Sequence, residues 1–404
     1  MPRKILFVLI VACFTLLAQA KPGIKSIVVF GDSLSDAGNV PIWSLDNPVS
    51  PDLLYPSPPY YMGRGSNGPV WIEVVAGAYG YDVSPYLAGG TNFAFAGAES
   101  GTGLSDQDSP NFLSQVRMWQ NAVADEEIEP PMPWQLFVVW FGPNDMLRYL
   151  AETAMAGELP TREGIEETIA TAVQNLATGI VGIHGLNGRM FLVPNMPPLH
   201  LTPWGLSQDQ ALQLVLQAMT DGFNQALEDA LVRIENAYDK VTILRLDTNA
   251  FMVDAITFPE EYALEEVFLP ALDTSTGTML GDPDVFLSWD GFHPTAVIHA
   301  IVAELAMDVI PIGSWWGHSM ARGPDGEAFL GMGWVNDSHW PWVYVYGMGD
   351  GGEWMWAIED GGSLDGFLAL IPKGRKWVFV NARTGSYYDY TTGTWHKMPT
   401  PGGG

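Results

Sequence analysis

The sequence predicts an α/β fold, with a parallel sheet between two layers of helices, followed by a small all-β domain. Strand-like apolar segments alternate with amphipathic helices up to about residue 312, the order typical of a parallel sheet covered on both faces. The first strand-like segment is almost continuously apolar, as in strands that are buried on both sides. After residue 312 the pattern changes to tryptophan-rich stretches separated by glycine-rich turns.

The strand-like segments are short apolar runs, and several are followed by glycine or asparagine. They cover residues 24–30, 91–96, 136–141, 190–195 and 241–247. Because the carboxyl ends of parallel strands meet at one edge of a sheet, polar residues that follow these runs are expected to gather there.

Helices are predicted between these strands. Residues 161–183 carry apolar side chains at steps of three and four, which indicates one buried helical face. The helix after the fourth strand-like run is expected to begin with Ser207 and Gln210, which have the spacing of a capping box. Further helices are predicted at 70–79 and at 295–308.

The first 20 residues have the features of a signal peptide. Arg3 and Lys4 precede an apolar run, and Ala18-Gln19-Ala20 fits a cleavage site with small residues. Export is therefore expected, and no later segment is long and apolar enough for a membrane span. Residues 10–13 also resemble a lipoprotein processing box that would anchor Cys13. Ordinary export is favoured because residues 14–17 continue the apolar run.

Composition excludes several classes of function. Cys13 is the only cysteine, so a chain cleaved after Ala20 has no disulfide, thiolate nucleophile or cysteine metal ligand. The formal net charge of −28, from 18 basic and 46 acidic residues, repels nucleic acid and anionic membrane surfaces. Neither is expected as a direct partner. Apart from His293 and His299, the histidines show no spacing typical of a metal site.

Five residues after strand-like runs or in late loops could form a serine hydrolase site. Ser33 follows the first strand, Gly97 the second and Asn144 the third, while Asp290 and His293 lie in the late segment "WDGFHPT". A serine hydroxyl needs a base such as imidazole to become nucleophilic, and a carboxylate can hold that imidazole in one tautomer. A glycine N–H and an asparagine amide are suitable donors for a tetrahedral oxyanion.

The segments "FGDSLSDAGN", "GTNFAFAGA", "FGPND" and "WDGFHPT" resemble, in order, the four signature blocks of the GDSL or SGNH hydrolases. The wider similarity, over residues 24–310, is to the branch with phospholipase/lecithinase/haemolysin-like lipases and some carbohydrate acetyl esterases. This resemblance implies a three-layer α/β/α sandwich with a parallel sheet of about five strands. It also implies an esterase that needs no metal or cofactor.

The resemblance assigns roles residue by residue. Ser33 would be the nucleophile, and its own N–H the first oxyanion donor. Gly97 would supply the second donor and the Asn144 side chain the third. His293 would act as general base and then as acid, with Asp290 orienting it.

The sequence is compatible with two classes of substrate, an ester of a small molecule and an ester group carried by a polymer. Tyr55, Tyr60 and Tyr61 lie in a proline- and tyrosine-rich loop, 48–68, that is predicted to form one wall of the cleft. Such aromatic side chains suit an acyl chain and a sugar equally. Lipid or short-to-medium acyl esters are preferred, with acetylated polysaccharide as the alternative. A rival of another class is a surface-binding protein that uses the hydrolase fold only as a scaffold.

The domains are predicted as a signal peptide over 1–20, a catalytic domain over 21–312 and a β-domain over 313–404. Nine of the 16 tryptophans fall in the last of these. They are interpreted as the core of a small β-domain. The alternative is a module with exposed tryptophan faces that contacts polysaccharide or a cell surface.

Overall fold

The structure is a computed structural model. It describes most of the first part of the chain and the strands of the last part, namely residues 24, 26–50, 53–55, 57–132, 135–310 and the strands between 321 and 397. The predicted signal peptide and Cys13 lie outside the described residues. The chain divides into two compact units, one over residues 25–310 and the other mainly over residues 311–404. The functions predicted for these parts stay predictions.

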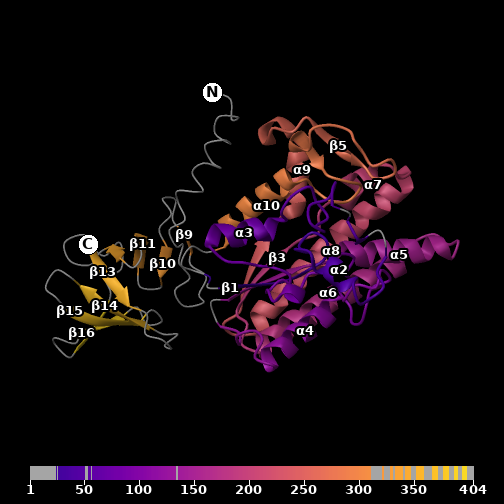
Figure 1. The fold of residues 1–404 in the computed structure, drawn as a ribbon. Coiled ribbons are helices and arrows are strands. Elements are labelled where there is room, and N and C mark those ends of the chain that lie inside the picture. Colours follow the sequence, from indigo (N-terminus) through magenta and orange to yellow (C-terminus); the bar gives the residue numbers. More distant parts are fainter. Residues whose placement is uncertain are drawn as a thin grey trace. The chain divides into compact units, whose positions relative to one another are not determined.

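A four-stranded parallel sheet forms the centre of the first unit (Figure 1). Its strands follow one another in space as in the sequence: β1 (Ser26–Gly31), β2 (Gln135–Trp140), β3 (Met190–Pro194) and β4 (Thr242–Leu246). Every residue of β2 and β3 is buried, as in a sheet covered on both faces. The predicted α/β class and parallel sheet are confirmed.

The segment Thr91–Phe95 takes the place of a fifth strand at the free edge of β1. Its backbone makes three hydrogen bonds to β1, of 2.7 to 3.1 Å, but only one bridge, at Asn92, has regular strand geometry. The Asn92 side chain explains this irregularity. It donates to the carbonyl of Ser35 and accepts from the N–H of Ala94, so that local bonds replace part of the ladder.

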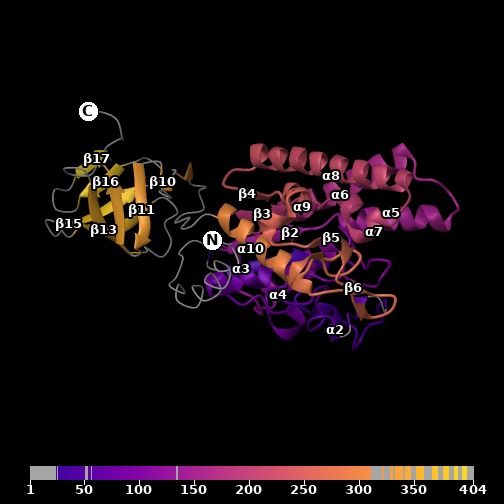
Figure 2. The ribbon, with the colours of Figure 1, turned by 90° about the horizontal axis from the view of Figure 1, so that it is seen from above.

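Helices cover both faces of the sheet (Figures 1 and 2). On one face α3 (Trp71–Tyr79) packs against α10 (Ala296–Val309). On the other face α6 (Arg162–Gly185) lies between α4 (Phe112–Ala124) and α8 (Gln210–Ala237). The sheet is therefore the middle layer of a three-layer sandwich.

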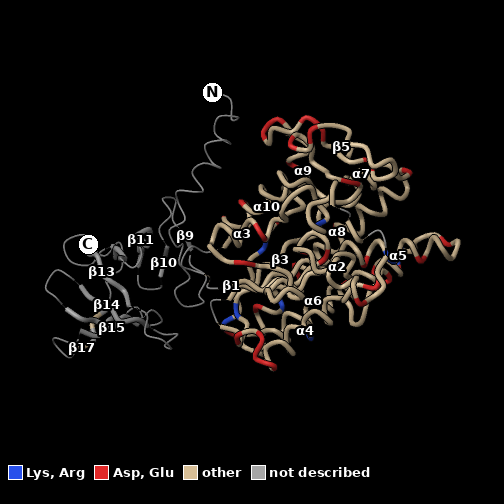
Figure 3. The backbone as a smooth tube through the Cα atoms, in the orientation of Figure 1, with Lys and Arg blue, Asp and Glu red and all other residues tan. Residues whose placement is uncertain are grey.

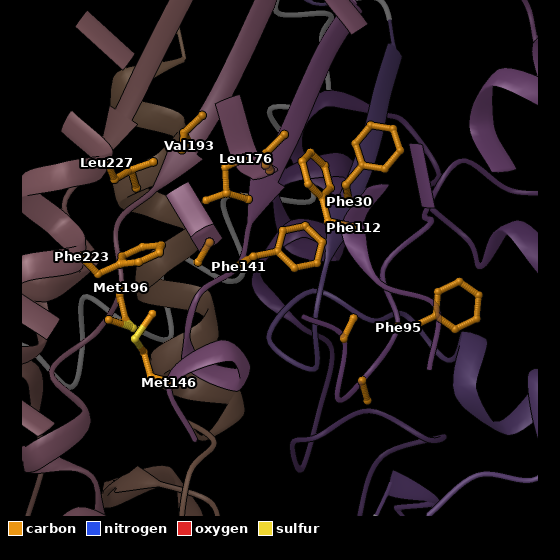
Figure 4. Packing of buried hydrophobic residues seen from close by; sticks show 14 of the residues in the cluster. Phe30, Phe95, Phe112, Phe141, Met146, Leu176, Val193, Met196, Phe223 and Leu227 are labelled. Atoms are coloured by element: carbon orange, nitrogen blue, oxygen red, sulfur yellow. The ribbon is translucent and has the colours of Figure 1, made fainter. Parts of the chain in front are cut away.

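Aromatic side chains join the sheet to this second helical layer (Figure 4). Phe112 of α4 packs edge-on against Phe30 of β1 and lies 4.8 Å, between ring centroids, from Phe141 after β2. Gly179 of α6 makes room for Phe112, because a Cβ there would lie 2.2 Å from its ring. These contacts fix the end of β1, which Ser33 follows, and the end of β2, which Asn144 follows.

The start of α8 differs from the prediction. Asp209 is the N-cap, and its carboxylate accepts the N–H of Leu212 at 2.9 Å. The capping box expected from Ser207 is wrong, because a separate short helix, α7 (Pro203–Leu206), ends at Ser207. The Ser207 hydroxyl donates instead to the carbonyl of Trp204.

The remaining elements of the first unit connect these strands and helices. They are α2 (Asn39–Trp43), α5 (Pro143–Met155), α9 (Thr248–Thr257), the 3-10 turns η2 (Tyr86–Ala88), η3 (Leu199–Leu201), η4 (Pro259–Tyr262) and η5 (Pro283–Val285), and the strands β5 (Glu266–Pro270), β6 (Leu272–Asp273), β7 (Thr278–Met279) and β8 (Phe286–Ser288). Within the described part of the chain, no helix is both long and apolar enough to cross a bilayer.

The second unit is an antiparallel sheet whose neighbouring strands are also neighbours in sequence. Its strands are β9 (Ala321–Arg322), β10 (Ala328–Leu330), β11 (Gly333–His339), β12 (Trp342–Tyr346), β13 (Gly352–Ile358), β14 (Gly366–Ile371), β15 (Lys376–Asn381), β16 (Ser386–Asp389) and β17 (Thr394–Lys397). This is the meander of hairpins expected from the sequence. The tryptophan side chains of this unit lie outside the described residues, so their predicted roles stay predictions.

Candidate active site

The nucleophile loop is a tight turn at the end of β1. The carbonyl of Asp32 accepts the N–H groups of Ser35 and Asp36, and the Asp32 carboxylate accepts the N–H of Leu34. A Cβ on Gly31 would lie 2.8 Å from the Cβ of Ser35, so the turn requires glycine there. Ser33, between these bonds, is half-buried and presents its hydroxyl at the edge of the sheet.

The loop after β8 brings Asp290 and His293 to Ser33. The Nε2 atom of His293 lies 2.9 Å from Ser33 Oγ, and its Nδ1 lies 2.8 Å from Asp290 Oδ2. The N–H of Trp289 donates to the carbonyl of His293 and closes the turn. Ser33, His293 and Asp290, predicted from separate blocks, are thus joined in one continuous chain of hydrogen bonds.

Electrostatics stabilise the ionised pair in this chain. Burial raises the pKa of Asp290, but the charge and hydrogen bond of His293 and two backbone N–H groups outweigh it, so that the pKa lies below its ordinary value. Burial lowers the pKa of His293, and the adjacent Asp290 carboxylate raises it to a net value above the ordinary one. A carboxylate at Nδ1 favours the tautomer with its proton there, which leaves Nε2 free to accept from Ser33.

The three expected oxyanion donors follow strand-like segments at the carboxyl edge of the sheet, where Ser33 also lies. Among the described residues, the backbone N–H groups of Ser33 and Gly97 find no hydrogen-bond acceptor, so both remain available to a ligand. Gly97 has φ +76°, and a Cβ there would lie 2.4 Å from Gln107 Oε1. Asn144 is the second residue of α5, and its amide donates one hydrogen to the carbonyl of Ala98 at 2.9 Å, which leaves the second hydrogen free.

Side chains of the first signature block connect the nucleophile loop to the Gly97 loop. The buried Asp36 carboxylate accepts the N–H groups of Gly38, Asn39 and Ala96. The Asn39 amide donates to the carbonyls of Asn92 and Ala94. Asp36 and Asn39 therefore brace the nucleophile loop against the segment that leads to Gly97.

The family model described as GDSL-like Lipase/Acylhydrolase matches residues 27–306. The chain belongs to this family. It is a GDSL-type carboxylic ester hydrolase.

Similar proteins include esterases and an acyltransferase. A GDSL esterase/lipase of Arabidopsis thaliana is 23% identical over 69% of this chain and 87% of its own. A phosphatidylcholine-sterol acyltransferase of Aeromonas hydrophila is 27% identical over 72% of this chain and 92% of its own. Among solved structures, a variant of an acetyl xylan esterase from Geobacillus stearothermophilus is 16% identical, covers 72% of this chain and 97% of its own, and has a TM-score of 0.36.

The three loop tyrosines of the hydrolase differ in position. Tyr60 is buried, and its hydroxyl donates to Asp290 Oδ2 at 2.7 Å. Tyr55 is also buried, with its hydroxyl 3.4 Å from His293 Nε2. Tyr61 is 38% exposed. Tyr60 therefore contacts Asp290 of the acid–base pair, and the prediction that this loop forms one wall of the cleft stays a prediction.

Gln115 is a site-supporting residue of the hydrolase that the sequence interpretation missed. This buried side chain of α4 accepts the N–H of Gly31 at 3.1 Å and donates to the carbonyls of Gly31 and Pro110 at 2.9 Å. It therefore fixes the end of β1 directly before the nucleophile loop. Its sequence signal was its position on the apolar side of α4, where a polar residue needs partners.

The described residues contain no group of three or more His, Cys, Asp or Glu side chains placed to hold a metal ion.

Proposed function

We propose that this hydrolase cleaves carboxylic esters through an acyl-enzyme on Ser33, with His293 as the base and Asp290 as its orienting carboxylate. The observation that carries the proposal is the unbroken chain from Ser33 Oγ to His293 Nε2, at 2.9 Å, and from His293 Nδ1 to Asp290 Oδ2, at 2.8 Å. The first distance allows direct proton transfer from Ser33 to His293. The second allows Asp290 to stabilise the imidazolium that this transfer forms.

In the first half-reaction His293 takes the proton of Ser33 while Oγ attacks the ester carbonyl. The carbonyl oxygen becomes an oxyanion that accepts from the N–H groups of Ser33 and Gly97 and from the Asn144 amide. As the intermediate collapses, the bond to the alcohol breaks and His293 gives its proton to that alcohol. The acyl group remains on Ser33.

In the second half-reaction a water molecule replaces the alcohol. His293 takes one proton of the water as the oxygen attacks the acyl carbonyl, and returns it to Ser33 as the intermediate collapses to the free acid. Asp290 stays ionised throughout and stabilises the imidazolium formed in each half.

A small cavity near the catalytic loops supports an ester substrate whose acyl group is aliphatic. It has a volume of about 40 Å³ and is mainly apolar. Leu34, next to the nucleophile, and Phe292, next to the base, both line it. Helix α9 supplies Met252 and Ile256. Leu201 and Leu287 also line the cavity. Burial of each methylene in such surroundings contributes about 0.8 kcal/mol. Because the cavity is mainly apolar, and because Leu34 and Phe292 are next to Ser33 and His293 in the sequence, we infer an aliphatic acyl chain of short to medium length.

Charge near the site supports a neutral or zwitterionic ester. Residues 246–310, which supply Asp290, His293 and part of the cavity, contain no lysine or arginine. Figure 3 shows acidic residues along the segment around α9 and β5. An anionic substrate would be repelled there. The similarity to an acyltransferase named for phosphatidylcholine agrees with a zwitterionic lipid.

Hydrolysis of nitrophenyl esters from acetyl to palmitoyl, by the wild-type chain and by Ser33→Ala, tests the proposal. We expect measurable turnover that falls at least a thousandfold in Ser33→Ala, with an optimum between butyryl and octanoyl. Equal rates in the two proteins would overturn the catalytic proposal. An optimum at acetyl, with release of acetate from acetylated xylan, would instead support the carbohydrate esterase.

Substitutions on α9 test the acyl group separately. Ile256 lines the cavity, whereas Val253 lies on the same helix and is 40% exposed. Ile256→Trp should lower kcat/KM for octanoyl esters more than for acetyl esters, because the added ring fills the cavity. Val253→Trp, the control, should leave the chain-length profile unchanged. The cavity assignment is wrong if both variants keep the wild-type profile.

We further propose that the hydrolase is exported. The support is the charged, apolar and small-residue pattern of residues 1–20. N-terminal sequencing of the protein from the expressing cells should find Lys21 first. A retained Met1 in all fractions, or a lipid on Cys13, would contradict soluble export.

A further inference from the structure

The Asp290 carboxylate has a hydrogen-bond donor from outside its own loop. The N–H groups of Phe292 and His293 donate to Oδ1 at 2.8 and 2.9 Å, and the imidazole lies against both oxygens. These groups lie within three residues of Asp290. The fourth donor is the Tyr60 hydroxyl, 2.7 Å from Oδ2, which comes from a segment 230 residues away in the sequence.

The segment around Tyr60 is joined to the acid–base loop at further points. The hydroxyl of Ser66 donates to the carbonyl of Pro294 at 3.2 Å, and the side chain of Asn67 accepts the N–H of Ala296 at 2.8 Å. Gly65 lies against the imidazole, since a Cβ there would be 3.1 Å from His293 Nε2. Residues 60–67 therefore follow the loop from Asp290 to the start of α10.

The Tyr60 ring is fixed independently of its hydroxyl. Its centroid lies 5.9 Å from that of Trp289, edge-on, and 5.0 Å from that of Tyr55. The residue is only 9% exposed. Burial and the neighbouring Asp290 raise the pKa of the Tyr60 phenol well above its ordinary value, so the hydroxyl keeps its proton and remains a donor.

We infer that Tyr60 is a positioning residue for the reaction, which holds the Asp290 carboxylate in the plane of the His293 imidazole and takes up part of its negative charge. The inference rests on the proposed roles of Ser33, His293 and Asp290. A carboxylate with one donor fewer concentrates its charge on the bond to His293 and stabilises the imidazolium more. It is also free to rotate away from the ring, which loosens the orientation that proton transfer needs.

Tyr60→Phe removes the donor and keeps the ring contacts. We expect kcat to fall about tenfold with KM little changed, and the acidic limb of the kcat/KM profile to move to higher pH. The proton resonance of His293 Nδ1 should shift as well. Tyr86→Phe is the matched control, because Tyr86 also donates to a carboxylate, that of Glu127, but at the exposed surface. This control should keep the wild-type rate and profile.

The same assay includes Ser33→Ala, so that two failures are distinguishable. If Ser33→Ala is as active as the wild type, the proposed function fails. If Ser33→Ala is inactive while Tyr60→Phe keeps the wild-type kcat and acidic limb, only the role of Tyr60 is overturned. A lower kcat with a lower melting temperature but an unmoved limb and resonance would show a purely structural tyrosine, and this result also overturns the inference.

Discussion

The amide of Asn144 donates a 2.9 Å hydrogen bond to the carbonyl of Ala98, the residue directly after Gly97. Two proposed oxyanion donors, from different parts of the chain, are therefore tied to each other. Asp145, the next residue on α5, strengthens the connection, because its carboxylate accepts both the N–H and the hydroxyl of Ser100. The geometry of the oxyanion site thus depends on the contact between α5 and the Gly97 loop.

Asn144→Ala removes one proposed donor. We expect kcat to fall about 100- to 1000-fold with little change in KM, because the bond to the oxyanion forms mainly in the transition state. Steady-state kinetics on the best nitrophenyl ester measure this. A change confined to KM, or a kcat within threefold of wild type, would show that Asn144 only holds the Ala98 carbonyl.

Gly97→Ala tests the close approach of the second donor. Its φ of +76° is unfavourable for alanine, and the new Cβ would lie 2.8 Å from Leu53 Cδ1. Gly103 has a similar φ, +78°, with nothing near a Cβ. We expect Gly103→Ala to cost about 1–2 kcal/mol of stability and to leave kcat unchanged. Gly97→Ala should cost more and lower kcat, as measured by urea unfolding and kinetics. Equal effects of the two variants would contradict a special role for Gly97.

The pH dependence of kcat/KM should report the raised pKa of His293. The neutral imidazole is the active base, so activity rises with pH as His293 loses its proton, and the midpoint should lie above the ordinary value of about 6.5. In Asp290→Asn the carboxylate charge is gone, and burial, which lowers the pKa of His293, outweighs the remaining charge of Asp32, so the midpoint should fall below 6.5. Profiles of the two proteins measure both values, and identical midpoints would contradict the charge coupling.

Asp32→Asn should stabilise the fold at high pH. Burial raises the pKa of Asp32 from its ordinary 3.8 to about 7, so the folded chain binds more protons than the unfolded chain between those values and loses stability as pH rises through them. The full difference corresponds to about 4 kcal/mol. Asparagine keeps an oxygen for the N–H of Leu34. Urea unfolding at pH 8 should therefore show a gain of up to about 4 kcal/mol, and at pH 4 a gain near zero. A loss of stability at pH 8 would contradict this.

Local patterns were enough to predict the sheet and much of the site. The apolar runs of β1 to β4 and the helical steps of α6 are properties of short segments, and the four signature blocks mark Ser33, Gly97, Asn144 and the Asp290–His293 loop. Helix α4 was missed although Phe112, Val116 and Trp119 recur at helical steps and are all buried. The segment between β4 and α10 has no periodic pattern that predicts its strands, because these strands are short and pair outside the main sheet.

The role of Tyr60 could not be read from the sequence for a different reason. Its partner Asp290 is 230 residues away, and no local pattern records which side chains two loops bring together. Proline, tyrosine and glycine in a loop are equally typical of a cleft wall. Gln115 is a similar case, because its partners lie at the end of β1, far from α4 in the chain.

The most direct test of the catalytic account is covalent labelling with a fluorophosphonate, followed by peptide mass spectrometry. The account predicts one adduct per chain, on the peptide that contains Ser33, with no adduct in Ser33→Ala and much slower labelling in His293→Ala. An adduct on another residue, or equal labelling of Ser33→Ala and wild type, would contradict the assignment of Ser33 as the nucleophile.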